Sequence, residues 1–260
     1  MDSTDCLKSF VDGHIGWMTI DRPESRGALT RDMWLALPAR LADLAAVQGV
    51  RVVVIRGSHG HFAAGADINE FAKLRSDADL ARQYDEGAEK TLSLLADLDV
   101  PSIAMIGGPC IGGGCLIAFG CDLRVVSTSA SLGIPAGRLG LAYPYAALER
   151  LVEVLGEPRA LDLTLTGRIV SGVEAQANGL AQYCTPDAEL EMLTRSIAGQ
   201  IARNAPLAMR YLRRALRRAS QSRIDRDTVD ALAAACFASE DYAEGVSAFL
   251  EKRDPVFNGR

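Results

Sequence analysis

Two glycine-containing segments give this chain its clearest chemical signal. The first runs from Gly57 to Ile68 and the second from Gly107 to Cys115, and each follows a short apolar segment typical of a buried strand. Small residues let a ligand approach the backbone, and the free N–H groups of a helix's first turn can point at an anion. If the two strands are adjacent and parallel, two N–H groups can face one oxyanion and stabilise an enolate or a tetrahedral anion. The alternative is that the glycines only allow helix and strand to pack tightly.

Other catalytic chemistries find little support in the sequence. Histidine occurs only at His14, His59 and His61, and no third ligand of suitable type lies near the last two, so we expect no metal site. The chain has no G-x-S-x-G motif, which argues against a nucleophilic hydrolase. The second glycine segment has Gly114-Cys115 where a phosphate-binding loop needs Lys-Ser or Lys-Thr. A G-x-G-x-x-G motif is also absent, so a dinucleotide-binding fold is not indicated.

The composition is that of an ordinary globular protein. Of 260 residues, 48% are hydrophobic and 23% are charged, and 28 basic against 33 acidic residues give a net charge of −5. This balance argues against a globally basic nucleic-acid-binding protein. No apolar run reaches the roughly 18–20 residues of a membrane span, and the acidic N-terminus lacks the features of a secretory signal. The six cysteines show no metal-ligand spacing. We therefore expect a cytoplasmic protein with reduced thiols that binds neither nucleic acid nor a membrane.

The two glycine segments need strands and helices to hold them. We predict strands at 15–20, 52–55, 103–106 and 123–126, the first of them paired with a strand around Phe10 across the Asp12-Gly13 turn. We predict helices that begin after Thr30, at about residue 80 and at about residue 114, and we expect Pro38 to kink the first or to force a boundary. This alternation indicates an α/β fold with parallel strands and helical crossovers.

The second half of the chain has a different pattern. After about residue 145 the strand signal nearly disappears, and helical periodicity dominates at 148–155, at 190–201 and onward to Leu250. We expect a core domain over residues 1–195, which contains the site, and a helical region over residues 196–260. The apolar residues of this last region exceed what one layer of helices can bury, so an oligomer interface is expected. These residues are Leu212, Leu216, Leu232, Phe237 and Phe249.

Several motifs, taken in order, resemble the crotonase (enoyl-CoA hydratase/isomerase) superfamily. The main pair is FAAGADI at 62–68 and, about 45 residues further on, IGGGC at 111–115. Weaker fragments are DRPESRGAL at 21–29, CD at 121–122, LTGR at 165–168 and ANGL at 177–180. The resemblance implies a spiral of repeated ββα units with a C-terminal helical trimerisation region. It also implies an acyl-CoA thioester as substrate, no separate cofactor, and a homotrimer or a dimer of trimers.

The resemblance also implies particular site residues. The backbone amides of Ala66 and Gly113 would hold the thioester oxygen, and Arg26 would bind a phosphate of coenzyme A, although a solvated surface charge is the alternative for this arginine. The coenzyme A and acyl path would be lined by residues from both segments and their neighbours. These are Ser25, Arg26, Ala28, Ala64, Asp67, Ile68, Ile111, Leu116, Pro135, Ala136 and Leu141.

The sequence departs from the family at the acid and base of hydration. Enoyl-CoA hydratases use two glutamates, and the matching positions here are Leu116 and Ala136, while the aspartate of dehalogenases and dienoyl isomerases corresponds to Pro144. None of these side chains can transfer a proton. We therefore expect an enzyme that polarises a thioester but hydrates an alkene poorly.

Other polar side chains lie near that position. The segment at 135–145 is similar to methylmalonyl-CoA decarboxylase, and the match selects Tyr143, whose hydroxyl is either catalytic or part of the pocket wall. Glu149 is the nearest downstream carboxylate, and an ordinary helix charge is its simpler interpretation. We expect an acyl-CoA-processing enzyme of the enoyl-CoA hydratase/isomerase family, a lyase or isomerase. The alternatives are a decarboxylase or isomerase of a short acyl-CoA that uses Tyr143, or a non-catalytic acyl-CoA-binding paralogue.

Overall fold

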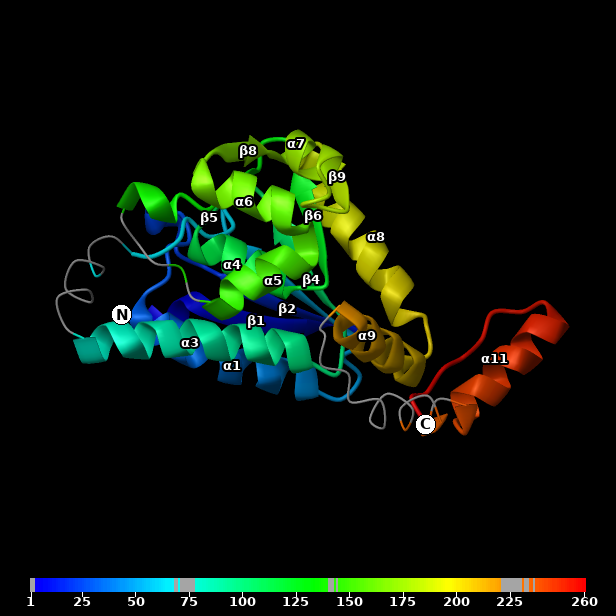
Figure 1. Ribbon diagram of the computed structural model, residues 1–260. Coiled ribbons are helices and arrows are strands. Elements are labelled where there is room, and N and C mark those ends of the chain that lie inside the picture. Colours follow the sequence, from blue (N-terminus) through cyan, green and yellow to red (C-terminus); the bar gives the residue numbers. More distant parts are fainter. Residues whose placement is uncertain are drawn as a thin grey trace.

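The computed structural model describes residues 3–67, 70, 78–139, 143, 145–220, 231, 234, 235 and 237–260 (Figure 1). Within these residues, nine strands form two sheets: β1 (Leu7–Asp12), β2 (Ile15–Ile20), β3 (Val52–Gly57), β4 (Ser102–Ile106), β5 (Pro109–Ile111), β6 (Leu123–Ser127), β7 (Ser131–Gly133), β8 (Ile169–Ser171) and β9 (Tyr183–Thr185). The helices of the described residues are α1 (Arg31–Ala46), α3 (Ala78–Asp97), α4 (Gly113–Gly120), α5 (Tyr145–Leu155), α6 (Glu157–Leu165), α7 (Gly172–Ala177), α8 (Leu190–Ala202), α9 (Pro206–Ser220) and α11 (Glu240–Glu251). Short 3-10 helices lie at Ser3–Cys6, Pro23–Ser25, Ala136–Leu139 and Asp187–Glu189.

The main sheet is largely parallel, as the alternation of strands and helices predicts. Its strand order is β1-β2-β3-β4-β6-β9, and only the β1–β2 pair is antiparallel. That pair is the predicted hairpin, in which Phe10 lies opposite Trp17 and Gly13 takes a positive φ of 58° in the turn. The second sheet has the order β5-β7-β8. Because β3 and β4 are parallel neighbours, the segments that follow them leave the same edge of the main sheet.

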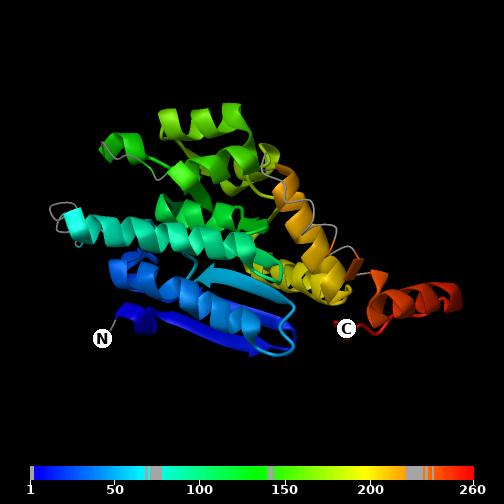
Figure 2. The same cartoon turned by 60° about the horizontal axis from the view of Figure 1, so that its bottom comes forward.

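Both faces of the main sheet are covered, which explains the continuous apolar runs of its strands. Along β3, Val52 and Val54 pack in one cluster with residues of α8, whereas Val53 and Ile55 pack in the other with residues of α1, α3 and α4. Figure 2 shows α1 and α3 side by side along the β1–β2 edge of the molecule, in agreement with their extensive contacts. The site segments therefore rest on a sheet that is buried on two sides.

Helix α1 confirms the predicted start and contradicts one of the two outcomes expected for Pro38, a helix boundary. The Thr30 side chain accepts a hydrogen bond from the N–H of Met33 at 3.2 Å, which is an N-cap. The helix continues from Arg31 to Ala46 with Pro38 inside it, so the predicted boundary is wrong. Leu37 and Leu41 flank the proline and are fully buried, and this packing holds the helix together across the missing N–H.

The expectation that strands nearly end at residue 145 is also only partly right. Strands β8 and β9 lie beyond it, and β9 extends the main sheet by pairing with β6. Each has three residues, which is too short to show a period of two in a sequence. Tertiary packing, and not local pattern, makes these residues strands.

The C-terminal helices keep apolar side chains on the outside. Leu212 and Leu216 of α9 are 45% and 69% exposed, and Phe237 is 66% exposed, whereas Arg213 of α9 is buried. Leu232 and the side chain of Phe249 fall outside the described residues. In Figure 1, α11 protrudes from the body of the molecule.

The predicted division at residues 195 and 196 falls inside α8. Among the described helices, none has the length and apolar character needed to cross a membrane.

Candidate functional site

The two glycine segments meet above the end of the sheet, through backbone bridges. Residues 58–67 follow β3 and form two parallel bridges with other segments. Ala66 pairs with Leu29, and Ala63 pairs with Cys110 of β5. The N–H of Leu29 donates to the carbonyl of Gly65 at 2.8 Å, and the N–H of Ile111 donates to the carbonyl of Ala63 at 2.9 Å. These bonds fix the first segment between Leu29 on one side and β5 on the other.

Among the described residues, the backbone N–H groups of Ala66 and Gly113 have no acceptor. Gly113 is the first residue of α4, where a helix N–H has no partner within the helix. Both chain neighbours of Ala66 are hydrogen-bonded to Leu29. The carbonyl of Gly65 accepts the N–H of Leu29, and the N–H of Asp67 donates to the carbonyl of Leu29 at 3.0 Å. No acceptor among the described residues takes the N–H of Ala66 or of Gly113. Both donors are therefore available to an anionic oxygen.

Glycine is required where the two segments come closest. A methyl group on Gly114 would lie 2.2 Å from the carbonyl oxygen of Ala63. Gly65 has a φ of +100°, and a methyl group there would lie 3.0 Å from the carbonyl oxygen of Ile111 and 3.9 Å from the amide nitrogen of Gly113. The glycines thus do allow tight packing, and that packing is what brings the segment of Ala66 beside the start of α4.

A buried ion pair holds the first segment from the other side. Arg22 and Asp67 are separated by 3.0 Å, with side chains 14% and 11% exposed, and Arg22 also donates to the carbonyl of Ala28 at 2.7 Å. The Arg22 guanidinium therefore links the 21–29 segment to the residue that follows Ala66. The sequence analysis missed Arg22 as a site residue, although it lies inside a quoted motif.

The remaining predicted binding residues occupy the rim of this region. Ala64 donates its N–H to the carbonyl of Arg26 at 3.0 Å, and Ala28 is buried. The Arg26 side chain is exposed and forms no ion pair with a described residue, so it is open to a ligand phosphate. Half-buried positions are Ser25, Ile111, Pro135 and Ala136. Ile68 and Leu141 lie outside the described residues.

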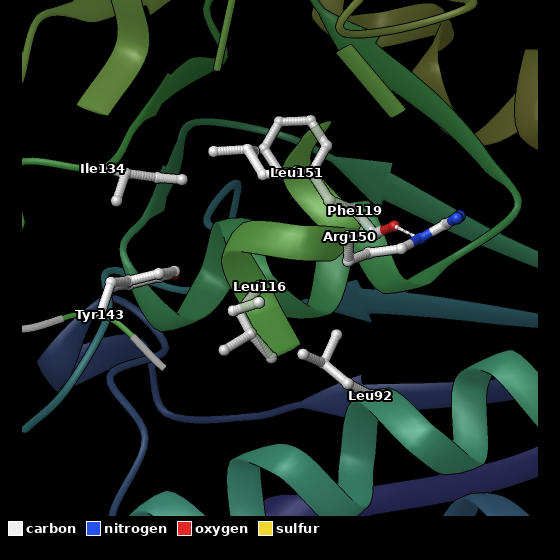
Figure 3. Close-up of a pocket in the computed structure, with 8 residues that line it drawn as sticks. Leu92, Leu116, Phe119, Ile134, Tyr143, Arg150 and Leu151 are labelled. Carbon is white, nitrogen blue, oxygen red and sulfur yellow. Dashed lines mark hydrogen bonds between the residues drawn. The ribbon is translucent and has the colours of Figure 1, made fainter. Parts of the chain in front are cut away.

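A small apolar cavity begins one turn into α4 (Figure 3). Its volume is about 10 Å³, which is close to the space that one water molecule needs. Leu116 and Tyr143 line it, and Ala136 is not among its lining residues. The sequence analysis missed the other lining residues, which are Leu92, Phe119, Ile134, Ala147, Arg150 and Leu151. They come from α3, α4, α5 and the segment after β7, so no local motif marks them.

Tyr143 is tied to the start of α4. Its O–H donates to the carbonyl of Gly112 at 2.8 Å, and the N–H of Gly112 donates to the carbonyl of Gly133 at 2.9 Å. Burial, followed by the nearby Cys115, Tyr84 and Cys110, raises the pKa of the Tyr143 phenol well above its ordinary value. The phenol is therefore neutral and can donate a proton or a hydrogen bond next to Gly113.

The charged groups around the cavity are turned away from it. Arg150 lines the cavity, but its guanidinium donates to the carbonyl of Phe119 at 2.9 Å and to Glu153 at 3.0 Å, as Figure 3 shows for the first of these. Burial lowers the pKa of Arg150, and the repulsion of Arg217 acts in the same direction. Glu149 is exposed on α5 and does not line the cavity. Its interpretation as an ordinary helix charge is therefore favoured.

Arginines secure the far end of α4. The carbonyl of Ala118 accepts from Arg124 at 3.4 Å, that of Phe119 from Arg150, and that of Gly120 from Arg217 at 2.6 Å. Cations at a helix C-terminus satisfy its free carbonyls and its dipole. Helix α4 is thus anchored at its C-terminal end while its N-terminal N–H groups stay free.

The cysteines and histidines that the structure describes form no alternative centre. Cys6, Cys110, Cys115, Cys121 and Cys184 are free thiols. Burial raises the pKa of Cys110 and, to about 12, that of Cys121, so these thiols stay protonated near neutral pH. In the part of the chain that the structure describes, no group of three or more His, Cys, Asp or Glu side chains could hold a metal ion.

Comparison with known proteins agrees with this geometry. The family model described as enoyl-CoA hydratase/isomerase matches residues 11–260. The 2,3-dehydroadipyl-CoA hydratase of Escherichia coli is 33% identical over 250 residues, 94% of each chain. The crotonyl-CoA hydratase of Syntrophomonas wolfei is 33% identical over 241 residues, 92% of each chain.

The solved structures give the same result. The crystal structure of an enoyl-CoA hydratase/isomerase family protein from Hyphomonas neptunium superimposes with a TM-score of 0.94 and 33% identity over 100% of both chains. This match confirms the predicted crotonase fold, with its mixed α/β core and its C-terminal helices. The sequence matches extend over nearly the whole chain and include named hydratases, which are lyases. The chain therefore belongs to the enoyl-CoA hydratase/isomerase family, whose members are enzymes that act on acyl-CoA thioesters.

Proposed function

We propose that this enzyme stabilises the enolate of an acyl-CoA thioester between the N–H groups of Ala66 and Gly113. The observation that carries the proposal is that both donors lack acceptors among the described residues while their segments are held together by close backbone contact. Backbone donors that are fixed before the reaction stabilise developing negative charge at no cost of reorganisation. The position of Gly113 at the N-terminus of α4 adds the favourable end of the helix dipole.

The rim of the site supports coenzyme A as the carrier of the acyl group. Arg26 has no ionic partner among the described residues and lies in the segment whose backbone bonds to Ala64. A guanidinium is well suited to phosphate, with which it forms charge-assisted hydrogen bonds. Arg26 would therefore bind a coenzyme A phosphate, while the thioester reaches the two amides.

Hydration is expected to be slow because the described lining of the cavity offers no carboxylate. Leu116 lines the cavity, and Ala136 is two residues after Ile134, which also lines it. Neither side chain can transfer a proton. General acid–base groups contribute about 10²- to 10⁴-fold to such steps. We expect crotonyl-CoA hydration at least about 10²-fold below that of a two-glutamate enzyme.

A second candidate reaction follows from Tyr143 and the apolar wall. In the decarboxylation of a short 2-carboxyacyl-CoA, the bond to the carboxylate breaks, carbon dioxide leaves, and the electron pair forms the thioester enolate. No general base is needed, an apolar wall disfavours the carboxylate, and the enolate then takes one proton at its α-carbon. The neutral phenol of Tyr143, whose O–H reaches the carbonyl of Gly112, is the described group best placed to direct that proton.

The reaction is identified by a steady-state screen of crotonyl-CoA, a 3-enoyl-CoA and methylmalonyl-CoA. We expect turnover of methylmalonyl-CoA or of the 3-enoyl-CoA to exceed that of crotonyl-CoA, and Tyr143→Phe to abolish the native reaction with little loss of volume. Efficient crotonyl-CoA hydration that is insensitive to Tyr143→Phe would show that an unassigned acid or base acts, and Glu149 would be tested next. Tight binding of all three thioesters without any turnover would instead indicate a non-catalytic binding protein.

We propose further that the enzyme assembles as a homotrimer or a dimer of trimers. Exposed apolar side chains on α9 and α6 support this, since Leu216 and Leu165 are 69% and 79% exposed. Helix α9 buries Arg213 and exposes Leu212 and Leu216, which is the arrangement expected of a helix that packs on a second subunit. Light scattering should give about three or six times the chain mass of 27.8 kDa at micromolar concentration, and a monomer would contradict the proposal.

A further inference from the structure

A paired carboxylate lies next to one of the two free amides. Asp67 follows Ala66 directly, and one of its carboxylate oxygens lies 3.0 Å from a guanidinium nitrogen of Arg22. Because both side chains are largely buried, water screens their charges only partly. Without the guanidinium, the negative charge of Asp67 would therefore act on an anionic oxygen held by the Ala66 amide.

Arg22 also closes a ring of contacts around Ala66. Its Nη1 donates to the carbonyl of Ala28 at 2.7 Å, and the next residue, Leu29, accepts the N–H of Asp67 at 3.0 Å. Leu29 pairs with Ala66 in a parallel bridge. Asp67 is thus held at its backbone by Leu29 and at its carboxylate by Arg22, and the peptide unit that joins it to Ala66 is held with it.

A guanidinium suits this position because it meets two acceptors at once. Its planar fork presents separate N–H groups to the Asp67 carboxylate and to the Ala28 carbonyl, whereas an ammonium acts as a point charge. A second carboxylate, that of Glu24, lies 3.6 Å from the Nε of Arg22, but its side chain is 65% exposed. Water weakens that contact, so the charge of Arg22 is directed mainly to Asp67.

We infer that Arg22 is a positioning residue for the proposed reaction, which acts through Asp67: it holds the Ala66 amide in place and neutralises the carboxylate beside the developing enolate. This inference rests on the proposed function, because that function places the thioester oxygen at the Ala66 amide. It assigns a role in the reaction to a residue that lies outside both glycine segments.

The charge of Asp67 matters mainly when the enolate forms. The thioester carbonyl of a bound substrate is neutral, whereas the enolate oxygen is negative, so an unpaired carboxylate raises the barrier more than it weakens binding. With an effective dielectric constant of about 20, two negative charges about 8 Å apart repel each other enough to slow a reaction about 30-fold. We expect kcat of Arg22→Gln to fall at least about tenfold, with a change in KM of less than about threefold.

Two variants separate neutralisation from a merely structural contact, measured by steady-state kinetics on the thioester that the screen identifies as substrate. Asp67→Asn removes the repelling charge but keeps the shape and an acceptor for Arg22, so kcat should fall less than about threefold. Adding Asp67→Asn to Arg22→Gln should bring kcat back to within about fivefold of the unmodified enzyme, because no unpaired carboxylate remains beside Ala66. A purely structural pair would instead lose about as much from either single change.

Arg22→Lys and Glu24→Gln complete the kinetic comparison. Arg22→Lys keeps the positive charge and loses only the fork, so its kcat should lie at least about threefold above that of Arg22→Gln. Glu24→Gln is the matched control, because it removes the exposed carboxylate contact of the same guanidinium and should leave kcat unchanged. If Arg22→Gln fails to fold in urea titrations, Asp67→Asn and the double variant still test the inference, since both must keep kcat within about fivefold.

The thioester carbonyl of a bound, ¹³C-labelled acyl-CoA gives a readout that needs no turnover. An unpaired negative charge beside Ala66 opposes the polarisation of this carbonyl. Its infrared band should therefore return part of the way to the frequency in water in Arg22→Gln, and should stay shifted in Asp67→Asn.

An unchanged kcat in folded Arg22→Gln would overturn the inference. Equal losses of kcat in Arg22→Gln and Asp67→Asn, or a double variant no faster than Arg22→Gln, would do the same. If one of these results appears while Ala66→Pro still loses turnover, the inference fails and the proposed function stands. If Ala66→Pro also keeps its turnover, the proposed function fails as well.

Discussion

Replacing Gly114 with alanine should separate the two segments that carry the free N–H groups. The added methyl would lie 2.2 Å from the carbonyl oxygen of Ala63, whereas ordinary contacts of this kind begin near 3.4 Å. Because this oxygen belongs to the backbone and also accepts the Ile111 N–H, it cannot rotate away as a side chain would. The segment of Ala63 must therefore move by about 1 Å relative to α4, and the Ala66 amide moves with it.

A displacement of this size has a large kinetic effect. A misplacement of about 1 Å in a catalytic arrangement can cost about 10²-fold in rate. We expect kcat for the native acyl-CoA reaction to fall about 10²-fold in Gly114→Ala, with a loss of about 1–3 kcal/mol in the free energy of unfolding from overpacking.

Steady-state kinetics measure kcat, and urea unfolding at equal enzyme concentration measures the free energy of unfolding. Gly137→Ala is the control, because a methyl group there has no heavy atom within 4 Å and the backbone φ is not positive. It should have nearly unchanged kcat and stability. Normal turnover in a folded Gly114→Ala enzyme would refute the claim that the spacing between these segments positions the donors.

Three further predictions concern single features of the site and its support. Ala66→Pro removes one donor and should lower turnover by about 10²- to 10³-fold in a folded enzyme, as steady-state kinetics will show; unchanged turnover would remove the two-amide interpretation. The double change Leu116→Glu with Ala136→Glu should raise crotonyl-CoA hydration, measured by loss of enoyl absorbance, if the cavity admits both side chains. Burial alone would raise the pKa of the Asp122 carboxyl, but two arginines of α9 outweigh this and lower it overall. The ionised Asp122 carboxylate therefore contributes its full stabilisation to the folded enzyme above its ordinary pKa of about 4, and this stabilisation is lost as the pH falls through the lower pKa of the folded state. In Asp122→Asn, the free energy of unfolding from urea titrations should therefore fall less steeply as the pH is lowered.

Local pattern predicted the elements that hold the site. The valines of β3 have a strand on each side and helices on both faces, so their continuous apolar run is visible in the sequence. The start of α1 was predictable because the Thr30 cap is local. Pro38 and the strands β8 and β9 were not, because burial from distant elements overrides local preference at those positions.

Part of the site could likewise be predicted from local pattern, and part could not. The segments of Ala66 and Gly113 were recognisable because glycine is required by their own backbone contacts. The cavity was not predictable, since Leu92 and Phe119 are adjacent only through the packing of α3 on α4. The ion pair of Arg22 with a residue 45 positions later depends equally on the folded chain.

The hydrogen bonds to the thioester oxygen can be observed directly by isotope-edited infrared spectroscopy. An acyl-CoA substrate with a ¹³C-labelled thioester carbonyl would be bound to the unmodified enzyme and to Ala66→Pro. If the Ala66 and Gly113 amides both donate to this oxygen, the carbonyl band should lie at lower frequency in the unmodified enzyme than in water, and Ala66→Pro should return part of that shift. A band at the frequency found in water, or the same shift in both proteins, would contradict the two-amide site.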